Sequence, residues 1–242
     1  MANSYFRFKQ FTIHQDQCAM KVTTDACLFG AWTALQIRDS SVAGPSILDI
    51  GTGTGLLSLM TEQMVPDCRI EAIEIEEAAA GQAKKNIQEA GKEKSIRVIR
   101  EDIREYSQPE KFDFIISNPP FYEKELKGGN ALKNLAHHNE GLLLEELLTL
   151  APGQLRPGGK LFLLLPAKRE KEFMNLLQDK KLYLVHLCRV RPSEKADWFR
   201  LLCTISKEPG NSIRHEELTI LENETTYTPA FIQLLQPYYL YL

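Results

Sequence analysis

The feature that most constrains the fold is a glycine-rich turn between an apolar strand pattern and a helical pattern, Asp49-Ile50-Gly51-Thr52-Gly53-Thr54-Gly55. Glycines in such a turn let the backbone reverse sharply and approach a ligand with no Cβ in the way. The run Ser46–Ile50 is short and apolar, and residues 56–64 carry apolar side chains at helical spacing. The turn therefore predicts a strand-to-helix unit that binds a ligand at the carboxyl end of its strand.

Strand and helix patterns continue to alternate along the chain. We expect strands at 46–50, 69–75, 95–100, 112–117, 160–165, 182–190 and 199–206, with helices at 23–37, 56–64, 77–91, 142–151 and 168–178. Pro157-Gly158-Gly159 predicts a turn before the fifth strand. Such alternation is typical of a mainly parallel α/β sheet with helices on both faces. The 242 residues are expected to form one domain: a cap (1–44), a core (45–207) and a C-terminal extension (208–242) packed on that core.

Composition argues against several classes of protein. No apolar run reaches the roughly 18 residues that span a bilayer, and the N-terminus lacks the apolar stretch of a signal peptide, so a cytoplasmic protein is expected. The five cysteines are scattered and form no CxxC pair, which disfavours a disulfide framework or a structural zinc site. The net charge of -3 gives no global attraction to nucleic acid, although a local basic face is compatible with it.

The residues around the glycine turn indicate the kind of ligand. A dinucleotide-binding turn would carry its third glycine at position 56, where this chain has Leu56, and here the acidic Asp49 precedes the turn. Both departures favour a ligand without a pyrophosphate and with a positive amino-acid end. Glu74 closes the second strand, where a carboxylate accepts ribose hydroxyls. Asp102 follows the third strand, in place to accept an adenine amino group. Adenosine with a charged amino-acid tail is the outline of S-adenosylmethionine.

A second motif, Asn118-Pro119-Pro120-Phe121, directly follows the fourth strand pattern. Two prolines fix φ and remove two backbone donors, so the segment is rigid and presents carbonyl oxygens. The Asn118 amide and the Pro119 carbonyl supply two acceptors, which match the two hydrogens of an NH₂ group. Phe121 is suited to stack on a planar base. This motif predicts methylation of an exocyclic amino nitrogen.

Together these residues resemble the class I amino-methyltransferases, and in particular the tRNA1(Val) adenine-37 N6-methyltransferase family. The resemblance extends over nearly the whole chain: Phe6-Arg7-Phe8-Lys9-Gln10-Phe11, Lys21-Val22-Thr23-Thr24-Asp25, the glycine turn, Glu74, Asp102, the Asn-Pro-Pro-Phe motif, Leu218-Thr219-Ile220, Tyr227-Thr228-Pro229-Ala230-Phe231 and Tyr238-Tyr239-Leu240. One departure is Thr24, where the family usually carries glycine.

The resemblance implies a seven-stranded sheet of order 3-2-1-4-5-7-6 with the last strand antiparallel. It also implies S-adenosylmethionine as cofactor, tRNA as substrate and direct attack by the amine, with no metal and no covalent intermediate. The expected cofactor-binding residues are Lys21, Thr23, Asp25, Asp49, Gly51, Thr52, Gly53, Gly55, Glu74, Ile75, Asp102, Ile103 and Asn118. The expected catalytic residues are Asn118, Pro119, Pro120 and Phe121.

Basic residues suggest where RNA binds. Between Lys181 and Lys207 six basic residues stand against two acidic ones, and three lysines follow the catalytic segment. We expect RNA phosphates to contact Lys124, Lys127, Lys133, Arg189, Arg191, Lys195 and Arg200. His137 and His138 are adjacent, so on a helix they would point about 100° apart and form a poor metal pair.

Other functions fit parts of the same pattern. Glutamine N5-methyltransferases of release factors share an Asn-Pro-Pro-aromatic motif, but usually carry a longer helical N-terminal domain. A non-catalytic RNA-binding module would not need an intact Asn118 motif. A nicotinamide dehydrogenase is disfavoured by Leu56 and by the lack of an evident proton-transfer residue. The sequence leaves the oligomeric state open, with a monomer as the default expectation.

Overall fold

The structure is a computed structural model that describes residues 4–18, 21–119 and 142–242. Its centre is an eight-stranded sheet of order β10-β8-β9-β7-β6-β3-β4-β5. The strands are β3 (Ser46–Ile50), β4 (Arg69–Glu74), β5 (Ile96–Arg100), β6 (Phe112–Ser117), β7 (Leu155–Pro166), β8 (Tyr183–Ser193), β9 (Arg200–Ser206) and β10 (Arg214–Leu221). Only β9 runs antiparallel to its neighbours in this sheet.

The expected strand order is confirmed, but the expected number of strands is wrong. The seven expected strands lie in the order 3-2-1-4-5-7-6, and β10 adds an eighth beyond β8. Because β9 runs antiparallel to β8, it ends beside the start of β8. The chain then begins β10 at that end of the sheet, so β10 pairs parallel to β8. Leu218 and Ile220 on β10 are buried in the core, and this burial stabilises the added strand.

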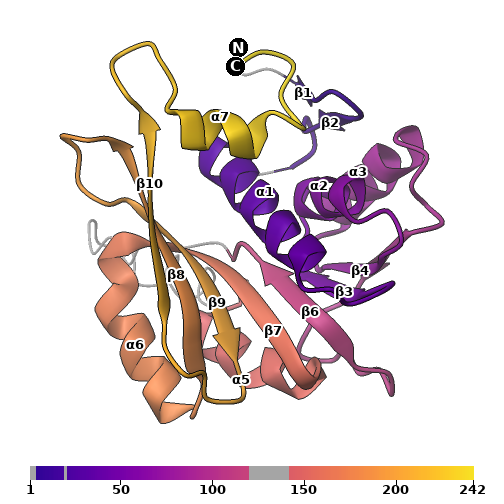
Figure 1. The fold of residues 1–242 in the computed structure, drawn as a ribbon. Helices are drawn as coiled ribbons and strands as arrows, with labels where there is room; N and C mark the ends of the chain where they lie inside the picture. The colour runs from indigo at the N-terminus through magenta and orange to yellow at the C-terminus, as the bar shows by residue number, and fades with distance from the viewer. Residues whose placement is uncertain (1–3, 19–20, 120–141) are drawn as a thin grey trace, which may run out of the picture.

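Helices cover both faces of the sheet (Figure 1). One face packs against α1 (Thr24–Asp39), α2 (Leu56–Met64), α3 (Glu77–Glu89) and α7 (Pro229–Leu235). The other packs against α5 (Leu144–Gln154) and α6 (Glu170–Asp179), with the 3₁₀ turn η1 (Ala167–Arg169) before α6. This two-faced packing explains why the strand sequences are apolar on both sides. None of the helices in the described ranges is long and apolar enough to cross a membrane.

The segment Pro157-Gly158-Gly159, expected as a turn, lies inside β7. The pairing between β6 and β7 jumps from Phe112–Leu155 to Phe114–Lys160, so the glycines form a bulge rather than a strand boundary. Gly158 has a φ of 75°, and a Cβ on Gly159 would lie 3.0 Å from two backbone oxygens. Glycine is therefore needed here for close backbone approach within a continuous strand.

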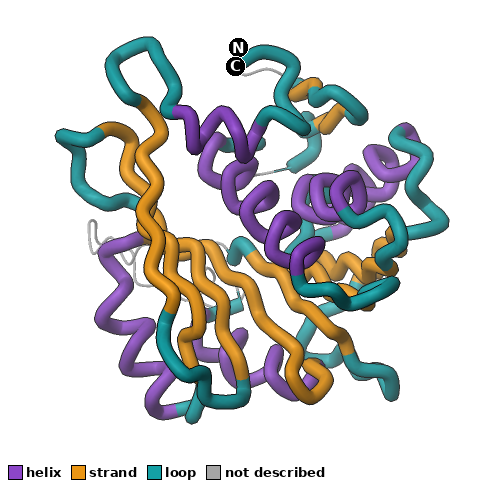
Figure 2. Tube along the Cα trace, viewed as in Figure 1, coloured by secondary structure: helices purple, strands orange, loops and turns teal. Residues whose placement is uncertain are grey.

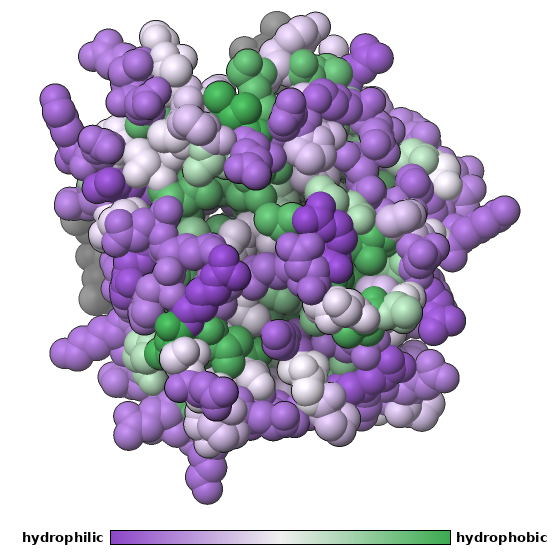
Figure 3. Space-filling view, in the orientation of Figure 1, coloured by the Kyte–Doolittle hydropathy of each residue, from purple (hydrophilic) through white to green (hydrophobic). Residues whose placement is uncertain are grey.

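The two ends of the described chain lie side by side (Figure 2). A hairpin of β1 (Tyr5–Arg7) and β2 (Thr12–His14) approaches the C-terminal segment through a bridge between Phe8 and Tyr239. The Tyr238 hydroxyl donates to the Met60 carbonyl at 3.0 Å, from a fully buried position. Hydrophobic residues are visible on the surface near these ends (Figure 3). Tyr241, in the C-terminal segment, is 89% exposed.

Candidate active site

The site lies where the parallel strands β3, β4, β5 and β6 end. In the sheet register, Ile50 at the end of β3 pairs with Ile73 and with Ser117, and Glu74 pairs with Arg100. The Ser117 hydroxyl also donates to the Ile50 carbonyl at 2.8 Å. Segments that were far apart in the sequence therefore leave the sheet at one edge, as expected for a doubly wound fold.

The glycine turn is held by backbone contacts to β4. The N–H groups of Gly51 and Thr52 both donate to the Ile73 carbonyl, at 2.9 and 3.0 Å. Gly51 and Gly53 have φ values of 73° and 57°, a region that favours glycine. The Glu74 carboxylate accepts the Gly53 N–H at 2.9 Å, so the acidic residue after β4 lies directly against the turn.

Asp49 is a fully buried carboxylate beneath the turn. Its Oδ2 accepts the hydroxyls of Thr52 and Ser58 at 2.7 and 2.6 Å. Among the residues that the structure describes, its buried Oδ1 has no hydrogen-bond partner. Burial raises the pKa of Asp49 to about 6, although the two hydroxyls oppose the shift. Such a carboxylate fits a ligand that brings a positive group to the turn.

The residues that follow β4 and β5 are acidic and apolar, the types that could hold a nucleoside. Glu74 accepts a second N–H, from Glu76, at 3.0 Å. Ile75 beside it leaves an apolar side chain 48% exposed, and Ile103 is buried in the next loop. Asp102 is bound by Arg104, whose hydrogen bonds lower the pKa of the Asp102 carboxyl. The loops after β4 and β5 thus carry two carboxylates, Glu74 and Asp102, and one exposed apolar side chain, Ile75.

Only part of the Asn-Pro-Pro-Phe motif lies within the described residues. Asn118 is half-buried and Pro119 is buried, immediately after β6. Five residues expected in the site lie outside the described ranges, namely Pro120, Phe121, Lys124, Lys127 and Lys133. The two adjacent histidines, His137 and His138, also lie outside them.

The three cap residues expected to bind the cofactor each form a hydrogen bond within the protein. The Thr23 hydroxyl caps α1 by accepting the Ala26 N–H at 3.4 Å, and Lys21 donates to the Gln15 carbonyl. Asp25 accepts from the Nε of Arg200 at 2.6 Å. Sequence reasoning assigned Asp25 and Arg200 to different ligands, whereas the structure pairs them with each other.

The expected RNA-contacting residues of the β8–β9 hairpin also differ in environment. Arg189 forms an ion pair with Glu170. Arg191 donates to the Thr219 hydroxyl at 2.8 Å and lies 4.8 Å above the centre of the Trp198 ring. Lys195 is exposed at the hairpin tip. Because β8 ends and β9 begins at the same edge as the glycine turn, this hairpin lies on the candidate-site side of the sheet.

Sequence reasoning missed the residues that hold the cap against the turn. Asn86 is fully buried and makes three hydrogen bonds: it accepts the His14 N–H at 3.0 Å and donates to the carbonyls of His14 and Thr54, both at 2.9 Å. Gln82, one turn earlier on α3, accepts the Gln17 N–H at 3.3 Å. The sequence does contain a signal for these contacts, because the amide residues Gln82 and Asn86 stand four residues apart among the apolar positions of α3.

The described residues contain no group of three or more His, Cys, Asp and Glu side chains that could hold a metal ion. The five cysteines are all buried and free.

This sheet order, glycine turn and pair of following carboxylates define a class I methyltransferase. The crystal structure of a predicted O-methyltransferase from Agrobacterium tumefaciens has the same fold, with a TM-score of 0.67 and 17% identity over 88% of this chain and 96% of that one. A family model described as Methyltransferase small domain matches residues 33–180.

The chain belongs to the tRNA1(Val) (adenine(37)-N6)-methyltransferase family, and the resemblance stated from its motifs is confirmed. A protein of that name from Bacteroides thetaiotaomicron is 37% identical over 243 residues, covering 100% of both chains. Another from Dyadobacter fermentans is 38% identical over 241 residues, covering 98% of each.

Proposed function

We propose that this protein transfers a methyl group from S-adenosylmethionine to N6 of an adenine in tRNA, at the position type named for its relatives, adenine 37 of tRNA1(Val). The observation that carries the proposal is the meeting of Asn118-Pro119 with the glycine turn at one edge of the sheet. Full-length relatives at 37% and 38% identity support the substrate class.

The described residues fit the cofactor. Asp49 would stabilise the ammonium group of the cofactor through its negative charge. Its buried Oδ1 has no hydrogen-bond partner among the described residues, so that oxygen's charge is not already neutralised by a donor. Glu74 would accept the ribose hydroxyls, Ile75 would pack on the adenine ring, and Asp102 would accept the adenine amino group. When bound, the cofactor supplies an electrophilic methyl group on a sulfonium.

Asn118 and Pro119 would do the positioning. The amide oxygen of Asn118 and the Pro119 carbonyl accept the two hydrogens of the target amine, which directs the nitrogen lone pair toward the methyl group. The exocyclic amine of adenine is a poor nucleophile because its lone pair is delocalised into the ring. Orientation therefore matters more than a strong base, and the proton leaves late to water. Phe121 would stack on the flipped base.

RNA would bind across the same edge. We assign phosphate contacts to Arg191 and Lys195 on the hairpin and to Lys124, Lys127 and Lys133 after the catalytic segment. Arg189 and Arg200 are engaged by Glu170 and Asp25, so they would brace the hairpin. A protein substrate would not need this basic surface.

The test is incubation with radiolabelled S-adenosylmethionine and undermodified total tRNA, followed by nucleoside digestion. Label should appear as N6-methyladenosine. Release factor is offered in parallel, and label there but not in tRNA would replace this proposal with glutamine N5-methylation.

A further inference from the structure

The loop after β5 holds Asp102 in one orientation. The Oδ1 of Asp102 accepts the backbone N–H of Arg104 at 2.9 Å and its Nε at 3.0 Å. The Oδ2 accepts the same Nε at 2.9 Å and the Nη2 at 2.7 Å. The N–H groups of Glu105 and Tyr106 both donate to the Asp102 carbonyl, which closes the turn. Both carboxylate oxygens are therefore bound by one guanidinium.

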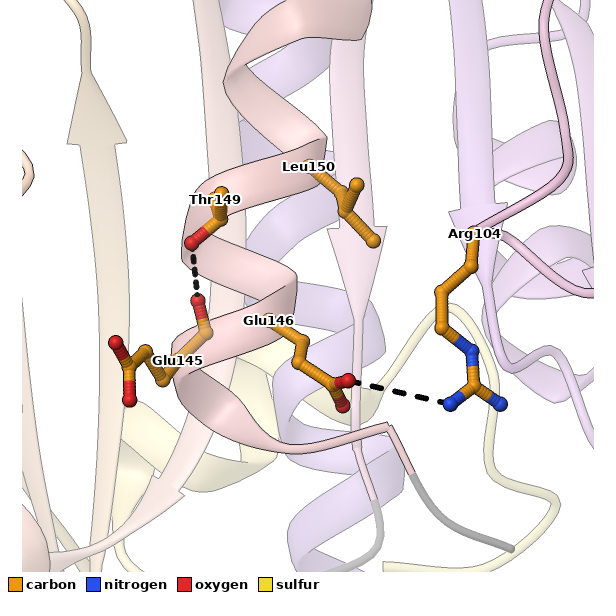
Figure 4. Close-up of a pocket in the computed structure, with 5 residues that line it drawn as sticks. All are labelled: Arg104, Glu145, Glu146, Thr149 and Leu150. Carbon is orange, nitrogen blue, oxygen red and sulfur yellow. Dashed lines mark hydrogen bonds and ion pairs between the residues drawn. The ribbon is translucent and has the colours of Figure 1, made fainter. Parts of the chain in front are cut away.

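Arg104 also connects this turn to α5, the helix that follows the catalytic segment in the chain (Figure 4). Its Nη1 lies 3.9 Å from Glu146, and Glu146 in turn accepts the Leu143 N–H at the start of α5 at 2.9 Å. Between them is a shallow pocket of about 250 Å³, lined by Arg104, Glu145, Glu146, Thr149 and Leu150. The guanidinium thus has a carboxylate on two sides, with Asp102 in hydrogen-bond contact and Glu146 at 3.9 Å.

We propose that Arg104 is a positioning residue that fixes the Asp102 carboxylate as acceptor for the amino group of the cofactor's adenine, and so sets the base selectivity of the cofactor site. This inference rests on the proposed function for the identity of the cofactor. Arg104 donates three hydrogens to this carboxylate: the backbone N–H, one on Nη2, and the Nε–H that both oxygens share. An ionised carboxylate has about four acceptor positions, so one is left for a further donor. A 6-oxo base presents an oxygen at the same place, and a fixed carboxylate repels it.

Without the guanidinium, the Asp102 side chain keeps only its bond from the Arg104 backbone N–H. Its Oδ2 then loses the partner that orients it, and the carboxylate can rotate away from the base. Adenine should lose a hydrogen bond to a charged acceptor, whereas a 6-oxo base should lose a repulsion. The two effects act in opposite directions on affinity, which separates positioning from general loosening of the site.

The experiment measures the dissociation constants of S-adenosylhomocysteine and its 6-oxo analogue S-inosylhomocysteine by calorimetry, with no RNA present. Wild-type protein should prefer the adenine form, and Arg104→Ala should reduce that preference by about threefold to tenfold. The matched control is Arg97→Ala, which removes an exposed arginine paired with Glu71 on the adjoining strand. That control should leave the preference unchanged.

Equal weakening of both ligands in Arg104→Ala would overturn the inference, as would an equal fall in preference in Arg97→Ala. Wild-type protein that binds both ligands without preference would show that Asp102 is not the adenine acceptor. Wild-type protein that binds neither would refute the proposed cofactor, and with it the proposed function.

Discussion

At the scale of single residues, the burial of Asp49 makes the stability of the fold depend on pH. Burial raises the pKa of its carboxyl from the ordinary 3.8 to about 6 in the folded protein. The folded state therefore holds the proton more tightly, and folding gains stability below pH 4 that is lost as pH rises through about 6. The loss amounts to at most about 3 kcal/mol.

This prediction is checked by urea unfolding of wild type and Asp49→Asn at several pH values. The free energy of unfolding of wild type, minus that of the variant, should fall between pH 4 and pH 7. Taking the difference cancels the titration of other groups. Asp179→Asn, at an exposed position on α6, is the control and should give a flat difference. A flat difference for Asp49 as well would refute the raised pKa.

Asn118 carries the second prediction at this scale. Replacement by alanine removes one of the two acceptors for the target amine, so the rate of methyl transfer should fall about a hundredfold or more. Affinity for S-adenosylhomocysteine should change far less. Single-turnover methylation and calorimetry measure the two quantities, and Asn175→Ala on the exposed side of α6 is the control. Unchanged transfer in Asn118→Ala would remove the basis of the proposed mechanism.

Sequence patterns located the residues whose roles depend on local geometry. Asp49 precedes a glycine turn and Glu74 ends a strand, so their positions follow from the chain itself. The partner of Asp25 did not follow, because Arg200 is 175 residues away and its contact depends on tertiary packing. Arg104 gave no signal either, since a charged loop residue usually indicates only a solvated surface.

At the scale of elements, Asn86 on α3 ties the β2 strand to the glycine turn. Asn86→Ala leaves the His14 N–H and two carbonyls without these partners, at a cost of about 1–3 kcal/mol for a buried donor. We expect residues 12–18 to exchange amide hydrogens faster and the cofactor product to bind more weakly. Hydrogen exchange and calorimetry measure these effects. Gln88→Ala on the exposed side of the same helix is the control, and equal effects there would contradict a specific tether.

The β8–β9 hairpin carries a prediction about charge. Lys195→Gln should weaken tRNA binding and reduce the slope of log affinity against log salt by about one, because one phosphate contact is lost. The KM for S-adenosylmethionine should not change. The control is Lys94→Gln, which makes the same charge change in the turn before β5, at the opposite end of the strands, and should leave the slope unchanged. An unchanged slope in Lys195→Gln would place the RNA elsewhere.

Elements with strong periodicity were predicted well, and those that depend on distant partners were not. The strands Ser46–Ile50 and Phe112–Ser117 and the helix Leu56–Met64 have the expected bounds, because a glycine or proline follows each of them within two residues. The bulge in β7 was missed because a Pro-Gly-Gly segment is more often a turn. The strand β10 was missed because only its last residues alternate between apolar and polar.

At the scale of the whole molecule, the C-terminal segment belongs to the same core as the N-terminal elements. Phe231 and Leu235 on α7 and Tyr238 are fully buried in a cluster that also contains Phe8 and Trp32. The strand β10 extends the central sheet beside β8. We therefore propose that residues 1–242 fold as one unit, with the segment after residue 208 required for its stability.

This proposal predicts a single cooperative unfolding transition that a C-terminal change shifts as a whole. Phe231→Ala removes a fully buried ring and should lower the free energy of unfolding by about 3–5 kcal/mol. Far-ultraviolet circular dichroism and tryptophan fluorescence should shift to the same lower urea midpoint, because Trp32 lies in the cluster with Phe231. Tyr241→Ala, at a position 89% exposed, should leave the midpoint unchanged. If only part of the signal moved in Phe231→Ala, the C-terminal segment would be a separate folding unit, and the cap and core would be stable without it.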